Sequence, residues 1–343
     1  MRYCLICDKN IADKKGSHIV PHFLMKRIDN EIGQKEREKE LGFVITGNYT
    51  VSYFGRGIQP EKLEELYGEV TEELISKNKI PLIVDYYFCT SCEKKLGYLE
   101  QEYSRTINLK TNTNAIYEST KQSFIAFLLW ASIVWRLSIL ENSGFKLKQK
   151  EENKLKRILK KYLNKDLSKI IANTNDSDLS DIGYKLLRAP NYSDNNSTWL
   201  HWSPVYSRPY SFIIDEYLLF FYFKKSYLKG MLLDFYNTEK EKQLAMFNTP
   251  FNGEKIYGIT DKKYEGINNN VLMFSTNKRL STLKKMLDLL HQELGGQGKE
   301  MYPSLKKEII NRIVNSNEKI GQKDTVKHYA KIIHETFKEF FKK

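Results

Sequence analysis

The chain has 343 residues, of which 41% are hydrophobic and 28% are charged, an ordinary balance for a soluble globular protein. At this length we expect two or three domains. Its 55 Lys and Arg residues against 42 Asp and Glu residues leave a net charge of +13. This charge favours polyanionic partners such as nucleic acid. The sequence has no Walker-type, G-x-S-x-G or G-x-G-x-x-G motif, which argues against the enzyme classes that use them.

The apolar segments do not predict a membrane protein. The first residues, MRYCLICDKN, carry charge and two cysteines where a secretory signal would have an apolar core. The longest apolar run, residues 124–135, has 12 residues and ends at Arg136, whereas a bilayer needs about 20. We therefore expect a cytoplasmic protein with no membrane partner, a buried core helix at this run, and an Arg136 that pairs with a buried carboxylate or a helix end.

The first third of the chain contains both of its cysteine pairs. Cys4 and Cys7 open the chain, and a Ser-His-Ile-Val-Pro segment follows with His18 at its second position. A β-hairpin is predicted over residues 42–55, where β-branched and aromatic residues flank a Gly-Asn turn. A helix is predicted next, and then a short strand that leads into the second cysteine pair and a further helix. These elements fall at residues 60–76, at the stretch IPLIVDYYF, at Cys89 and Cys92, and from Glu93 onward.

From about residue 118 onward the sequence predicts a mostly helical region with some strands. An apolar helix is predicted over residues 119–142, and an amphipathic basic helix over 145–165 whose lysines form either a solvated face or a phosphate-contacting face. Strands are predicted within 198–236, where His201 is expected to be a core or interface histidine, and within 255–275. Helices are predicted over 279–294, which ends at Gly295-Gly296, and in the tail from Pro303.

The four cysteines predict a zinc site. Zn²⁺ in structural sites takes four ligands in a tetrahedron, and a C-x-x-C pair supplies two thiolates from one tight turn. The two pairs, Cys4 with Cys7 and Cys89 with Cys92, use every cysteine in the chain. Redox-active pairs would need a βαβ context that the sequence lacks, and four unrelated buried cysteines would not fall into two such pairs by chance.

The pattern C-x-x-C, S-H-I-V-P and C-x-x-C-E resembles the HNH endonuclease superfamily, the ββα-metal nucleases, over about residues 1–105. The resemblance implies an α+β protein, in which a zinc-stapled treble-clef or ββα-metal module precedes a mostly helical C-terminal region. The module would span 1–117 with an insertion at about 24–86, and the second region 118–343. The resemblance also implies that the protein cleaves DNA and serves in bacterial defence, where such nucleases often act.

The resemblance assigns His18 as the general base, since histidine titrates near neutral pH and can activate water. A divalent cation, Mg²⁺ or Mn²⁺, would neutralise charge on the leaving oxygen. The chain departs from the family at the usual metal ligands. Ser17 stands where the family has Asp, Glu or His, and Glu93 stands where it has a histidine near the last cysteine. Glu93 is therefore the candidate replacement ligand, His22 a further candidate, and Asn48 the nearest counterpart of the family's middle asparagine.

Two alternatives remain open on the sequence alone. The first is a non-catalytic zinc-finger protein that binds nucleic acid without cutting it. The second is a scaffold with a purely structural zinc that binds a protein partner or a second copy of itself. The nuclease and zinc-finger hypotheses both predict nucleic-acid binding that weakens steeply with salt concentration, whereas the scaffold hypothesis predicts no salt-dependent binding of nucleic acid.

Overall fold

The structure is a computed structural model of the whole chain. It describes residues 2–25, 41–46, 50–54, 60–67, 71–72, 75, 82–107, 112–141, 143–190, 192, 198–229, 234–316 and 326–341. By their internal contacts these residues form two compact units. The first comprises residues 1–57 and 79–271, and the second 58–78 and 272–343.

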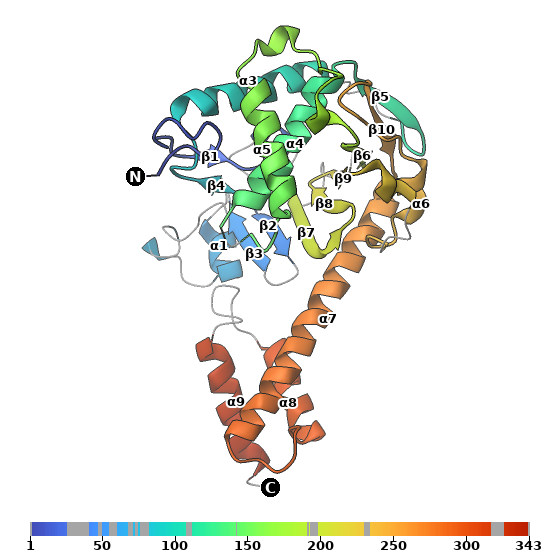
Figure 1. Cartoon of the computed structure of the whole chain (residues 1–343). Coiled ribbons are helices and arrows are strands. Elements are labelled where there is room, and N and C mark those ends of the chain that lie inside the picture. Colours follow the sequence, from blue (N-terminus) through green and yellow to red (C-terminus); the bar gives the residue numbers. More distant parts are fainter. Residues whose placement is uncertain are drawn as a thin grey trace. The chain divides into compact units, whose positions relative to one another are not determined.

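An eight-stranded mixed sheet is the centre of the first unit (Figure 1). Within the sheet β2 runs parallel to β7 and β10 parallel to β6, and the other neighbouring pairs are antiparallel. The predicted hairpin is confirmed as β2 and β3, and it extends this sheet rather than standing apart as an insertion. In spatial order the strands are β3 (Thr50–Phe54), β2 (Leu41–Thr46), β7 (Thr198–Ser207), β8 (Tyr210–Ile214), β9 (Tyr217–Tyr222), β6 (Gly183–Arg188), β10 (Glu254–Gly258) and β5 (Ile116–Thr120).

The central strands are buried on both faces. Successive side chains of a strand point to opposite faces, so an apolar run such as YLLFFY in β9 serves two cores at once. Leu219 and Phe221 belong to the larger core, which also contains the apolar sides of three helices. Leu218 and Phe220 belong to a second core with Tyr264, at the start of α7 (Asp261–Glu293).

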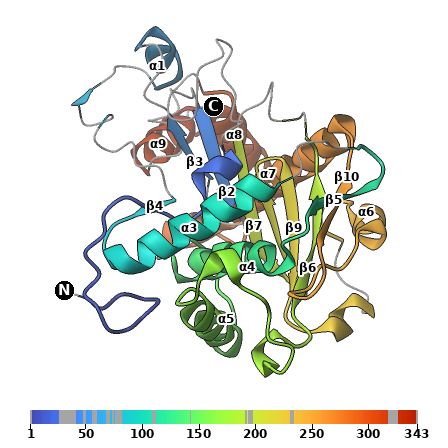
Figure 2. The ribbon, with the colours of Figure 1, turned by 90° about the horizontal axis from the view of Figure 1, so that it is seen from above.

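Three helices lie together on one side of this sheet (Figure 2). They are α3 (Thr90–Thr106), α4 (Ser123–Ile139) and α5 (Gln149–Tyr162). Helix α4 is the predicted apolar helix, and it is buried on all sides because α3, α5 and the sheet surround it. Among the described residues, no helix combines the length and the apolar character that a membrane crossing requires.

The smaller elements complete the first unit. The helix α6 (Glu239–Leu244) and short 3-10 turns connect the strands. A separate two-stranded sheet pairs β1 (Ser17–His18) with β4 (Ile83–Val84) in antiparallel fashion. The 3-10 turns are η1 (His22–Met25), η2 (Leu167–Lys169), η3 (Ser177–Leu179) and η5 (Lys225–Lys229).

Helices make up the described part of the second unit. They are α1 (Pro60–Tyr67), the later part of α7, α8 (Pro303–Val314) and α9 (Val326–Phe340). Leu287 of α7 shares a small apolar core with Leu305 and Ile309 of α8. The predicted stop after residue 294 is confirmed. Helix α7 ends at Glu293, and Gly295 follows with a φ of +77°, a conformation that favours glycine.

The α+β class is confirmed, but the strands after residue 118 are more prominent than the sequence suggests. Strands β6 to β10 all follow that residue and form most of the large sheet. Strand β6 lies outside both predicted strand regions, whereas most of the predicted strand region 255–275 forms the first turns of α7. In those turns Tyr264, Ile267 and Val271 share one buried helical face. The boundary predicted after residue 117 rests on the positions of the motifs. It lies inside the first compact unit, which comprises residues 1–57 and 79–271.

His201 is buried in β7, as expected of a core histidine. Its Nδ1 lies 2.8 Å from the Ile45 carbonyl oxygen and its Nε2 lies 2.9 Å from the Tyr236 hydroxyl. Burial lowers the pKa of His201 to about 4, because the imidazolium form would lose its hydration.

This burial predicts a histidine-dependent loss of stability in acid. The unfolded chain takes up a proton near pH 6.5, whereas the folded chain resists protonation until about pH 4. Stability is therefore fully present above pH 6.5 and falls as the pH decreases between these values. Between pH 7 and pH 5 we expect this residue to contribute a loss of about 2 kcal/mol in the free energy of unfolding. Urea denaturation at both pH values should show a smaller loss for His201→Gln, and an equal loss in both proteins would contradict the assignment.

Candidate metal centre

The first cysteine pair lies in a tight loop at the start of the chain. Tyr3 and Ile11 form a bridge across the loop, and the Cys4 amide donates a hydrogen bond to the Asn10 carbonyl at 2.8 Å. The turn closes through the Asp8 amide, which donates to the Cys4 carbonyl at 3.0 Å, and Asp8 takes a φ of 58°. This backbone conformation lets one tight turn direct both the Cys4 and the Cys7 side chains toward the same cluster.

The second cysteine pair lies at the N-terminus of α3. The Leu5 amide donates to the Tyr87 carbonyl at 3.0 Å, which fixes the first loop beside the residues that precede Cys89. Cys89 is the N-cap residue of α3, but its side chain makes no capping bond. Asp13 supplies the cap instead, because its carboxylate accepts from the Thr90 amide at 2.7 Å. The thiol of Cys89 is thus left available for another interaction.

The four predicted cysteines converge into one cluster that can hold a metal ion such as zinc. All are free thiols, and their Sγ atoms lie within 4.8 Å of one another. A Zn²⁺ ion with Zn–S bonds of about 2.3 Å would hold tetrahedral sulfurs about 3.8 Å apart, close to the observed spread. The Asn10 amide group donates to Cys89 Sγ at 3.6 Å, as an outer-shell donor does at thiolate metal sites. The donor set and its geometry therefore fit a closed structural site.

Protonation in this cluster is shared unevenly. The hydrogen bond with the Cys92 thiol, together with the amides of Cys7, Cys89 and Ile6, lowers the pKa of Cys4 to about 4. The same hydrogen bond with Cys4 raises the pKa of Cys92. Metal binding requires thiolates, and the lowered pKa of Cys4 favours the thiolate form at this position.

The basic helix α5 is tied to this cluster by ion pairs. Lys156 and Lys160, one turn apart, contact the two oxygens of Asp8 at 2.6 and 3.2 Å. On the same helix Arg157 pairs with Asp178 and Lys161 pairs with Asp176, each at 2.7 Å. These four basic side chains therefore pair with carboxylates of the protein itself, while Arg157, Lys160 and Lys161 stay largely exposed to solvent, as a solvated face requires.

Strand β1 brings Ser17 and His18 beside α3. Ser17 is fully buried, whereas His18 is half-buried with its Nδ1 atom covered. The Ser17 hydroxyl lies against the first turn of α3, close enough to Glu93 to offset part of the rise that burial causes in the pKa of that carboxyl. The other expected positions add nothing here, because Asn48 lies outside the described residues and the side chain of His22 is not described.

Glu93 is a half-buried carboxylate in the first turn of α3, next to Cys92. Burial raises the pKa of Glu93, and the nearby Ser17 hydroxyl and Arg136 guanidinium partly offset this rise. The Glu93 Oε2 and Ser17 Oγ atoms are both buried, and apart from the contact between these two side chains neither has a hydrogen-bond partner among the described residues. Two oxygen atoms in this state could accept a hydrated or bare divalent cation, because Mg²⁺ and Mn²⁺ prefer oxygen ligands.

Arg136 of α4 joins the elements around this position. Its Nη1 donates to the His18 carbonyl at 2.7 Å and to Glu100 Oε1 at 2.9 Å, and the arginine side chain is only 2% exposed. Arg136 pairs with a carboxylate, as predicted, although the partner Glu100 is only partly buried. The sequence did not reveal that Glu100 is the partner, although Glu93 and Glu100 lie seven residues apart and so share one flank of α3.

Comparison with known proteins gave no relative: no family model, curated protein or solved structure matches the chain.

The cysteine cluster predicts that metal binding requires each of the four thiols. We expect purified protein to contain one zinc ion per chain. The Cys92→Ser variant should lose this zinc or bind it at least about 100-fold more weakly, because one of the four thiolate ligands is removed. Metal analysis after dialysis against a chelator measures this, with Ser91→Ala as a neighbouring control. Full zinc retention in Cys92→Ser would contradict the site.

The buried ion pair predicts a large cost for removing one partner. Arg136→Met should lower the free energy of unfolding by about 3 kcal/mol, because the Glu100 carboxylate and the His18 carbonyl lose their donor. The double variant Arg136→Met/Glu100→Gln should recover part of this loss, since the remaining side chain is neutral. Urea denaturation of the single and double variants measures both effects, and a loss under about 1 kcal/mol in the single variant would contradict the role.

Proposed function

We propose that the protein is a metal-dependent endonuclease of the HNH type that cleaves DNA. One observation supports this most directly. Ser17 Oγ and Glu93 Oε2 are buried oxygen atoms on neighbouring elements, and apart from the contact between their two side chains neither has a hydrogen-bond partner among the described residues. They stand at the two positions where the resembling family has metal ligands. The cysteine cluster next to them would act as the structural staple of the module.

The local charge favours a cation beside Glu93. Glu93 and Glu100 contribute two carboxylates, and a zinc ion with four thiolates would add a net charge of −2 next to Cys92. Arg136 offsets only part of this negative charge. Glu93, with Ser17, would hold a divalent cation that stabilises negative charge on the phosphate.

His18 would supply the proton transfer. In hydrolysis a water oxygen forms a bond to phosphorus, and the phosphorus bond to the leaving oxygen breaks. The His18 imidazole would take the proton from that water, and its backbone carbonyl is already held by Arg136 at 2.7 Å. A fixed backbone limits the positions that the imidazole ring can reach, which favours a positioned base over a mobile one.

A nicking assay tests the proposal. The wild type should cut supercoiled plasmid in the presence of Mg²⁺ or Mn²⁺. The cleavage rate should fall at least about 100-fold in His18→Ala, which is the usual rate loss when a general base is removed, and also in Glu93→Gln. His334→Ala, an exposed histidine of α9, is the matched control and should cleave normally. Zinc content is checked in every variant, so that a loss of the structural metal is not mistaken for a loss of chemistry. Equal cleavage by wild type and His18→Ala would rule out this base.

A second candidate is a non-catalytic nucleic-acid-binding protein, and the position of Arg136 favours it. The guanidinium contacts Glu100 and influences Glu93, so it supplies an internal positive charge where a catalytic cation would act. The net charge of +13 supports nucleic acid as the partner under either candidate. Salt-dependent binding of DNA or RNA with no cleavage under any metal would favour this second candidate.

A further inference from the structure

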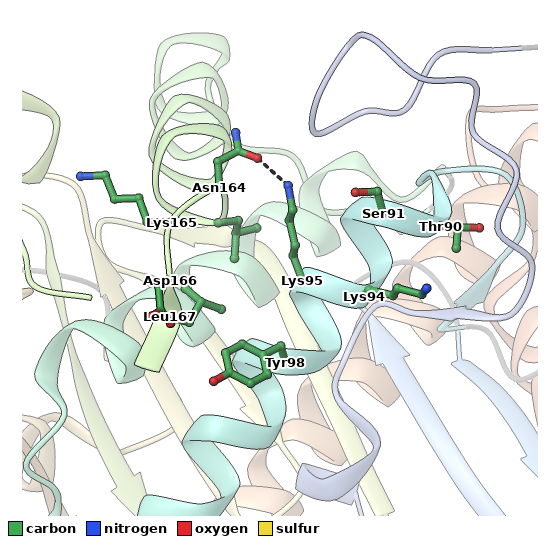
Figure 3. A pocket seen from close by; sticks show the side chains of 10 residues that line it. Thr90, Ser91, Lys94, Lys95, Tyr98, Asn164, Lys165, Asp166 and Leu167 are labelled. Carbon is green, nitrogen blue, oxygen red and sulfur yellow. Dashed lines mark hydrogen bonds between the residues drawn. The ribbon is translucent and has the colours of Figure 1, made fainter. Parts of the chain in front are cut away.

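A pocket of about 630 Å³ lies between α3 and the segment that joins α5 to η2 (Figure 3). Lys94, Lys95 and Tyr98 line it from α3, and Asn164 and Lys165 line it from the other wall. Its volume falls within the usual range of ligand pockets, about 300–1,000 Å³, and is larger than a single phosphate needs. All of its residues belong to the first unit.

This pocket is separate from the Glu93 position. Its α3 residues are spaced as i, i+3, i+4 and i+7 from Ser91 to Tyr98 and so form one face of the helix. Glu93 and Glu100 lie on roughly the opposite side of the helix axis, and Leu96 points into the core between the two faces. A ligand in the pocket would therefore not occupy the proposed cation position.

The lysines of the pocket differ from those of α5 in their charge environment. Lys156, Lys160 and Lys161 each contact an aspartate. Among the described residues, no carboxylate forms an ion pair with Lys94 or Lys165. Lys165 lies over the Tyr162 ring at 5.0 Å, which leaves its charge in place.

The third lysine and the one acidic residue of the pocket are already engaged. Lys95 donates to the neutral Asn164 side chain at 2.6 Å, so its positive charge also remains. Asp166 lines the pocket as well, and its carboxylate accepts from the Ser168 amide and hydroxyl. Three cations against one carboxylate leave the pocket positive, which suits an anionic ligand.

The arrangement of the side chains indicates an extended anion rather than a compact one. In Figure 3 Lys95 reaches across the pocket to Asn164, while Lys94 and Lys165 leave the two walls in opposite directions. Both amines point outward from the rim of the pocket, so they can neutralise separate phosphates of one strand that runs across its mouth more readily than a single phosphate group. Tyr98, whose side chain is 36% exposed, adds a ring face on which a base can stack.

We propose that this pocket binds the backbone of a nucleic-acid strand, with Lys94 and Lys165 on phosphates and Tyr98 under a base. The inference rests on the proposed function only in taking nucleic acid as the partner, and it holds whether or not the protein cleaves.

Binding of a fluorescein-labelled single-stranded oligonucleotide to the full-length, zinc-loaded protein tests the inference. Fluorescence anisotropy without added Mg²⁺ or Mn²⁺ gives Kd over a range of salt concentrations. For Lys94→Gln/Lys165→Gln we expect Kd to rise about tenfold, and the slope of log K against log salt to fall by about 1.4, since each lost phosphate contact on a single strand contributes about 0.7. The matched control is Lys121→Gln/Lys262→Gln, which removes the same charge from exposed lysines elsewhere in the first unit.

Tyr98→Leu separates stacking from charge. It should weaken single-strand binding by about 5-fold to 100-fold, because an unstacked base loses roughly 1–3 kcal/mol, and it should leave the salt slope unchanged. A labelled duplex of the same sequence should be nearly unaffected by this variant, since its bases are already stacked. Free ATP as a competitor distinguishes a strand from a small nucleotide, and displacement by ATP at concentrations near the strand's Kd would overturn the strand assignment.

The outcomes distinguish this inference from the proposed function. Equal weakening in the pocket and control variants would overturn the pocket alone, because general charge would explain it. No binding of wild type to any nucleic acid would overturn both ideas. Loss of cleavage in His18→Ala with unchanged binding, together with weakened binding in Lys94→Gln/Lys165→Gln, would support both.

Discussion

The convergence of four thiols from two distant stretches is the constraint on which the N-terminal region depends. Eighty-one residues separate Cys7 from Cys89, yet the four sulfur atoms lie within 4.8 Å of one another. Thiolates at that distance repel each other unless a cation or shared protons lie between them. A bound metal ion would therefore turn this repulsion into attraction and cross-link the two cysteine pairs, an arrangement called the clip below. Closing a long loop costs chain entropy only slowly with length, which makes such a separation tolerable.

The clip also determines where the candidate site lies. Cys89 and Cys92 flank the start of α3, so fixing their sulfurs fixes the first turn that carries Glu93. The backbone bonds of the first loop to residues 87 and 88 then bring the chain toward β1 and its partner β4. Ser17, His18 and Glu93 are therefore positioned by the cysteine cluster, although none of them belongs to it.

Helix α4 connects this region to the large sheet through polar groups inside an otherwise apolar helix. Arg136 reaches the His18 carbonyl and Glu100 on one side. Toward the sheet, the Trp130 indole donates to Glu254 at 2.8 Å, and the Tyr103 and Tyr184 hydroxyls donate to the same buried carboxyl. Unpaired polar groups at these depths would be costly, so the pairs restrict how α3, α4 and the sheet can pack. The N-terminal module is consequently built into the first unit and is not an independent attachment.

The features that depend on a local sequence pattern could be predicted before the structure was known. The spacing of the cysteines predicts the cluster, the continuous apolar run predicts α4 as a buried helix, and the alternation around residues 42–55 predicts the β2–β3 hairpin. Each follows from chemistry within a few neighbouring residues, namely thiolate preference for metals, burial of apolar surface and strand periodicity.

Which charged groups meet could not be predicted, because it depends on how distant elements pack. The lysines of residues 145–165 look alike in sequence, but Lys156 and Lys160 meet Asp8 whereas Lys165, just after α5, meets no carboxylate among the described residues. The partnership of Arg136 with Glu100 and the joining of β2 to β7 likewise pair residues that lie far apart in the chain. Pairing at this range depends on how helices and strands pack, and no local pattern encodes it, because a charge or a strand edge can be satisfied by any complementary group that packing brings near.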